Sequence, residues 1–118
     1  MTEAELLKAV TKRCDDLGLY WYHNFDWRTG KMAGWPDMVI VGHGMLFREL
    51  KSAGEPVKAN QSDCGRRISA AGGNWAVWRP ADLESGHIQR ELRELAECPM
   101  HATRPPEMAS NYVRVLPE

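Results

Sequence analysis

The stretch GWPDMVIVGHGMLFRELK, residues 34–51, predicts two short strands joined by a glycine turn. The first strand, Met38-Val39-Ile40-Val41, is apolar on both faces, as a strand in the middle of a buried sheet is. The turn at residues 42–44 sends the chain back along a second strand that begins at Met45 and ends at Leu50. We therefore expect a hairpin near the centre of a sheet.

Three charged side chains lie at one end of this hairpin. Asp37 opens the first strand, while Glu49 and Lys51 are two residues apart at the end of the second. Side chains two apart on a strand point to the same face, so the hairpin can bring all three together. Two carboxylates in contact repel by about 4 kcal/mol at an effective dielectric of about 20, unless one is protonated or a cation lies between them. A hard divalent ion such as Mg²⁺ meets that need. The pattern predicts a metal site beside a lysine, which suits hydrolysis of a phosphodiester.

Length and composition limit the possible classes of protein. The chain has 118 residues, which is enough for one domain with a single core. Its cysteines, Cys14, Cys64 and Cys98, match neither a disulfide framework nor a zinc signature. The formal net charge of −1 gives no basic surplus, so contact with DNA would need a local patch. No apolar run approaches the length of a membrane span, and the N-terminus is acidic where a signal peptide is basic. We expect a cytoplasmic protein without a membrane partner.

The periodicity of the remaining sequence predicts further helices and strands. Helices are expected at residues 2–17, 59–71 and 82–97, and strands at residues 19–22 and 75–78. Thr2 can cap the first helix, and Gly18 follows its end. The order α-β-β-β-α-β-α predicts an α/β domain over residues 1–97, with a mixed β-sheet flanked by helices. Residues 98–118 are expected to form a C-terminal extension that packs on the domain or at a dimer contact.

Two polar side chains fall on the inward faces of predicted helices. Glu3 lies on the apolar stripe that continues through Leu6 and Val10. Glu5 lies about 200° round the helix from Glu3 at 3.6 residues per turn. A carboxylate facing the sheet needs a reason to lose its water, and a metal ion or its water shell provides one. Gln61 points inward from the second helix, where it could bind a water or a phosphate, or could simply cap the helix start.

These motifs, in this order, resemble the virus-type replication-repair nuclease (VRR-NUC) domain, a branch of the PD-(D/E)XK nuclease superfamily. The matching residues are Glu3, Leu6, Ala9, Val10, Leu17-Gly18, Gly34-Trp35-Pro36-Asp37, Glu49-Leu50-Lys51, Gln61, Gly72-Gly73 and Asp82. Each motif is weak alone, and their shared order and spacing make the resemblance more specific. Trp35 departs from the pattern, which has a smaller apolar residue before the proline. The resemblance implies a restriction-endonuclease-like core and a deoxyribonuclease that depends on Mg²⁺ or Mn²⁺.

The resemblance also implies roles for single residues and for the whole chain. The implied catalytic residues are Glu3, Asp37, Glu49, Lys51 and Gln61. Asp37 and Glu49 would bind the metal together with the backbone carbonyl of Leu50, and Glu3 would reach it directly or through a water. The family implies a homodimer that cuts branched DNA, such as Holliday junctions, flaps or forks, during DNA repair. It also implies a bacterial or phage-infected host cytoplasm.

Basic residues near these motifs are candidate phosphate contacts, although each alone is equally well explained as a solvated surface charge. They are Arg28, Lys31, Lys58, Arg66 and Arg67.

Two other classes of function stay open. A protein of the same fold that has lost cleavage would hold DNA junctions or ends without cutting them. Alternatively, Glu49 and Lys51 could be a surface ion pair in a structural or interaction protein, since such pairs are common and contribute little. Chelator-sensitive cleavage distinguishes an enzyme from a binder. An effect of divalent metal on the melting temperature distinguishes a metal-site protein from the third class.

Overall fold

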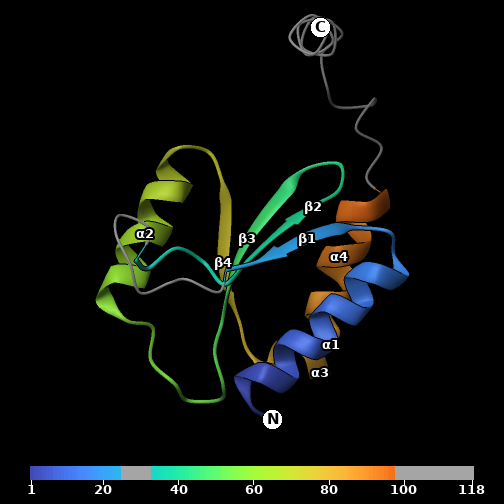
Figure 1. The fold of residues 1–118 in the computed structure, drawn as a ribbon, viewed down its shortest axis with the longest axis horizontal. Coiled ribbons are helices and arrows are strands. Elements are labelled where there is room, and N and C mark those ends of the chain that lie inside the picture. The colour runs from blue at the N-terminus through green and yellow to red at the C-terminus, as the bar shows by residue number, and fades with distance from the viewer. Residues whose placement is uncertain (25–32, 98–118) are drawn as a thin grey trace, which may run out of the picture.

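The computed structural model describes residues 1–24 and 33–97. Within these residues, a four-stranded mixed sheet has the strand order β1-β2-β3-β4. The strands are β1 (Tyr20–His23), β2 (Met38–Val41), β3 (Met45–Leu50) and β4 (Asn74–Trp78). The helices are α1 (Glu3–Asp16), α2 (Ala59–Ala70), α3 (Pro80–Glu84) and α4 (His87–Glu97). Figure 1 shows α2 on one side of the sheet and α1, α3 and α4 on the other. The predicted α/β domain with a mixed sheet flanked by helices is confirmed.

The hairpin of β2 and β3 lies at the centre of the sheet with the predicted bounds. Its antiparallel register pairs Met38 with Arg48 and Val41 with Met45. Strand β1 pairs antiparallel with β2, and β4 pairs parallel with β3. Parallel neighbours need a crossover connection, which α2 and its flanking loops provide. The predicted extension, residues 98–118, lies outside the described residues.

The hydrophobic core lies between the sheet and the helices α1 and α4. Its buried side chains include Leu6, Val10 and Cys14 of α1, Met38, Ile40, Leu46 and Leu50 of the hairpin, and Ile88, Leu92 and Leu95 of α4. Helix α1 begins with a capping box, in which the Thr2 hydroxyl accepts from the Glu5 N–H and the Glu5 carboxylate accepts from the Thr2 N–H. None of the helices in the described ranges is long and apolar enough to span a bilayer.

Two features differ from the sequence-based prediction. The single last helix expected at residues 82–97 is divided into α3 and α4, because Pro80 starts α3 early and Gly86, at φ +86°, interrupts the helix. The expectation of a buried strand at residues 75–78 holds fully only for Trp78, since β4 is at an edge of the sheet.

Arg48 is completely buried on the face of the sheet that packs against α4. Its guanidinium forms an ion pair of 3.0 Å with Glu91 and donates a 2.7 Å hydrogen bond to the backbone carbonyl of Asn74. It also lies over the ring of Trp78, whose Nε1 donates to Glu91 at 2.8 Å. A buried charge is strongly unfavourable without such partners. The Arg48 network therefore holds β3, β4 and α4 together.

Helix α2 lies close against β4 because Gly65 has no side chain. A Cβ atom at Gly65 would overlap the indole of Trp75, and Gly65 is the buried residue of this helix.

We expect Gly65→Ala to destabilise the fold by about 1–3 kcal/mol, because the added methyl forces α2 away from Trp75. The loss would occur although alanine favours a helix by about 1 kcal/mol over glycine. Urea unfolding of this variant, with Ser69→Ala on the exposed side of α2 as the control, measures the effect. A Gly65→Ala protein more stable than the wild type would contradict this close packing.

Candidate active site

The hairpin brings Asp37 and Glu49 side by side. Because Met38 pairs with Arg48, the residue before Met38 and the residue after Arg48 become cross-strand neighbours. The Leu50 N–H donates a 2.8 Å hydrogen bond to Asp37 Oδ2, which fixes this carboxylate at the end of β3. The carboxyl groups of Asp37 and Glu49 are close enough for a hydrogen bond through a shared proton.

Glu49 is almost completely buried, with 2 % of its surface exposed. Its Oε2 accepts a 2.7 Å hydrogen bond from Gln61 Nε2, whereas its Oε1 is buried without a hydrogen-bond partner among the described residues. Burial, followed by the nearby charge of Asp37, raises the pKa of Glu49 to about 9. An unpaired buried oxygen is unfavourable, so a proton or a cation is expected at Oε1.

Gln61 has the capping role that the sequence left open and also contacts an acid of the site, while its binding of a water or a phosphate stays a prediction. Its Oε1 accepts a 2.9 Å hydrogen bond from the Lys58 N–H at the start of α2, while its Nε2 donates to Glu49. The amide is therefore fixed at both ends, and it orients one oxygen of Glu49.

Lys51 follows the last residue of β3 and is also buried, with 2 % of its surface exposed. Its Nζ lies 4.0 Å from Glu49 Oε2 and 3.8 Å from Glu55 Oε2. The Lys51 N–H donates to the Trp78 carbonyl at 3.1 Å, which extends the pairing of β3 with β4 to this residue. The lysine is thus held between two acids, with its backbone fixed.

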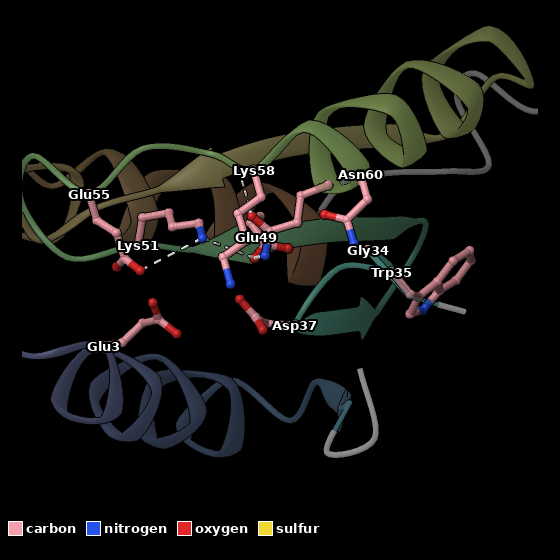
Figure 2. A pocket seen from close by; sticks show the side chains of 10 residues that line it. Glu3, Gly34, Trp35, Asp37, Glu49, Lys51, Glu55, Lys58 and Asn60 are labelled. Carbon is pink, nitrogen blue, oxygen red and sulfur yellow. Dashed lines mark hydrogen bonds and ion pairs between the residues drawn. The ribbon is translucent and has the colours of Figure 1, made fainter. Parts of the chain in front are cut away.

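The Glu3 side chain reaches the cluster of Asp37, Glu49 and Lys51 from the first turn of α1. Partial burial, a hydrogen bond with Glu55 and the charge of Asp37 raise the pKa of Glu3 to about 7. Figure 2 shows the Glu3 carboxyl group pointing from α1 toward the carboxyl groups of Asp37 and Glu55. By contrast, Glu5 is exposed and is used in the capping box of α1.

These side chains surround a cavity of about 250 Å³ at the end of the hairpin. It is lined by Glu3, Gly34, Trp35, Asp37, Glu49, Lys51, Glu55, Lys58, Asn60 and Gln61. Gly34 has φ +87°, and a Cβ atom there would collide with the Asn60 carbonyl, so glycine allows the chain to pass under the start of α2.

The sequence prediction missed Glu55 and Asn60. Both lie in or next to a loop with a glycine and a proline, where an acid or an amide is usually a solvated surface residue. The spacing of Ser52, Gly54 and Glu55 is a turn signal, but it does not show where the acid points.

The candidate phosphate contacts that the structure describes do not lie together. Lys58 lines the cavity. Arg66 and Arg67 lie on the outer side of α2, 73 % and 80 % exposed, and pair with Asp63 at 2.8 and 3.0 Å. The other two candidates, Arg28 and Lys31, lie outside the described residues.

The cavity residues fit a small divalent cation. Among residues 1–24 and 33–97, no three His, Cys, Asp or Glu side chains are arranged to hold a metal ion together. Mg²⁺, however, commonly takes one or two protein carboxylates and keeps several waters. Asp37 and Glu49 supply two carboxylates, and Glu49 Oε1 is buried without a hydrogen-bond partner among the described residues. The predicted third ligand, the carbonyl of Leu50, belongs to the same strand end.

No family model, curated protein or solved structure matched this chain. What the site can do is therefore inferred from its geometry.

We expect the stability of the metal-free protein to depend on Glu49. Because its folded pKa is about 9 against 4.5 as the ordinary value, the folded chain keeps a proton that the unfolded chain releases. This contribution to stability is complete below the ordinary pKa and is lost as the pH rises through the folded pKa. In EDTA, the melting temperature of the wild type should therefore fall with rising pH more steeply than that of Glu49→Gln. Mg²⁺ should stabilise the wild type increasingly as the pH rises. Equal slopes for the two proteins in EDTA would contradict the raised pKa.

Proposed function

We propose that this chain is a metal-dependent DNA endonuclease with a restriction-endonuclease-like core of the VRR-NUC kind. The observation that carries this proposal is the buried pair of Glu49 and Lys51 beside the half-buried Asp37, with Glu49 Oε1 left without a hydrogen-bond partner among the described residues. Buried ionisable groups with perturbed pKa values are concentrated at functional sites. A cavity beside them is open to a ligand. A surface ion pair in a structural protein would not explain this burial.

Each side chain has a distinct part in the proposed reaction. When bound, Mg²⁺ or Mn²⁺ would activate a water and offset the charge that develops on the phosphate. Asp37, fixed by the Leu50 N–H, and Glu49, oriented by Gln61, would hold that ion. Lys51 would orient or deprotonate the attacking water, or stabilise the developing charge. Glu3 would bind the same ion directly or through a water.

The charges of the cavity favour metal-dependent binding of DNA. The acids at its wall are Glu3, Asp37, Glu49 and Glu55, and the cations are Lys51 and Lys58. When its acids are ionised, the empty cavity has an excess of negative charge that repels a phosphate, whereas a bound divalent ion cancels that excess. DNA should therefore enter the site after the metal or together with it.

The proposed substrate is branched DNA, such as a Holliday junction, flap or fork, and the proposed assembly is a homodimer. One site in each chain requires two copies for symmetric cutting of both strands. The edge strand β1 offers a surface for such a contact, because Tyr20 and Tyr22 are 80 % and 61 % exposed.

Cleavage assays on duplex, flap, fork and four-way junction DNA test this function. We expect products with Mg²⁺ or Mn²⁺ and none with EDTA, and we expect Lys51→Met to lower the rate at least about 100-fold, as loss of a positioned charge does. Shifted DNA bands without products would favour the junction-binding alternative. If DNA is not bound and metal leaves the melting temperature unchanged, the chain belongs to the structural or interaction class.

We expect Glu3→Gln to cripple cleavage while folding and DNA binding are retained, because it removes the acid that α1 presents to the cavity. Glu5→Gln is the matched control on the same helix. It should be nearly silent, since glutamine can also accept the hydrogen bond of a capping box. Rates on one cleaved substrate and melting temperatures compare the two variants. If Glu3→Gln cleaved DNA at the wild-type rate and Glu5→Gln did not, the opposite face of α1 would face the site.

A further inference from the structure

A tight turn at residues 52–55 begins the loop between β3 and α2. The Glu55 N–H donates to the Ser52 carbonyl at 3.2 Å, and Gly54 has φ +78°, as the third position of a type II turn requires. The Glu55 side chain folds back over this turn, so that its Oε1 accepts from the Ser52 N–H at 3.1 Å and from the Ser52 hydroxyl at 3.0 Å. Arg79 Nη1 donates to the Ser52 carbonyl at 2.8 Å and anchors the turn. The Glu55 carboxylate is thus fixed, although its side chain is 38 % exposed.

The second oxygen of Glu55 faces the buried lysine. Glu55 Oε2 lies 3.8 Å from Lys51 Nζ, and Glu49 Oε2 lies 4.0 Å from the same atom (Figure 2). Lysine is a flexible point charge with many rotamers, so one acid would not define its position. Two acids on opposite sides of the ammonium do define it. If Glu55 were absent, Lys51 would pair with Glu49 alone, on the oxygen that Gln61 orients.

We propose that Glu55 is a positioning residue that holds the Lys51 ammonium away from Glu49. The inference rests on the proposed nuclease function and adds a residue outside the motifs that suggested it. An acid at the rim of a site for DNA would otherwise only repel the phosphate.

The Glu55→Gln variant distinguishes positioning of Lys51 from simple repulsion of the DNA phosphate. Glutamine keeps an oxygen that can accept from Ser52, but it removes the charge that faces Lys51. We expect kcat at saturating Mg²⁺ to fall about 10- to 100-fold, as it does when a supporting partner of a metal site is lost. KM for DNA should stay equal or decrease, because a negative charge near the phosphate is gone. An unchanged kcat with a lower KM would mean that Glu55 only repels DNA, which overturns the proposal.

Two further variants control this experiment. Glu84→Gln makes the same charge change at an exposed position of α3 and should leave kcat and KM unchanged. Ser52→Ala removes the hydroxyl donor to Glu55 without changing any charge, and it should lower kcat in the same direction by a smaller factor. If Glu55→Gln does not fold, Ser52→Ala decides the question, and an unchanged kcat in that folded variant overturns the proposal.

A measurement without catalysis distinguishes failure of this inference from failure of the proposed function. Wild-type protein that cuts none of the DNA substrates with either metal would remove the nuclease function. The NMR resonance of the Lys51 Nζ ammonium, assigned with Lys51→Met, would still report the position of the lysine. We expect Glu55→Gln to shift this resonance and Glu84→Gln to leave it in place. An unshifted Lys51 resonance in Glu55→Gln would overturn the positioning role whether or not the wild type cleaves DNA.

Discussion

Two carboxyl groups from neighbouring strands meet at the end of the β2–β3 hairpin, and the residues around them partly offset their repulsion. The Leu50 N–H donates to Asp37, Gln61 donates to Glu49, and the Lys51 ammonium lies 4.0 Å from Glu49. These contacts still leave Glu49 Oε1 without a partner and the pKa of this acid raised. Two adjacent carboxylates, one of them buried, are less unfavourable when a proton or a cation lies between them. The proposed metal ion would offset the repulsion that these contacts leave.

The cavity lies at the end of the sheet, where elements from both of its faces meet. Helix α1 packs on one face and provides Glu3, while α2 packs on the other face and provides Gln61 (Figures 1 and 2). Side chains on helices and strands are positioned more accurately than those on free loops. The loop that provides Glu55 is restrained by its own turn and by Arg79. All sides of the cavity are therefore held by the fold.

The sequence predicted those parts of the structure that depend on local patterns. The two apolar runs and the glycine turn within residues 34–51 were sufficient for the bounds of the hairpin and for the proximity of its charged residues. Strand order is a long-range property, so the incomplete burial of β4 at the sheet edge could not be derived. The ion pair of Arg48 with Glu91 joins residues far apart in the sequence, and no local pattern indicates it. Glu55 was missed because the direction of its side chain depends on a folded turn.

Arg48 and Glu49 are consecutive residues of β3 that point to opposite faces, one toward Glu91 and the other toward Gln61. If β3 slipped by one residue against its neighbours during folding, every side chain of the strand would exchange faces. Glu49 would then turn to the face of α4, where Glu91 would lose the cation of Arg48 and gain a second acid. Such a misaligned sheet would bring two acids together without their cation, which is strongly unfavourable. The adjacent opposite charges thus favour the native register of β3 and, with it, the placing of Glu49 beside Asp37.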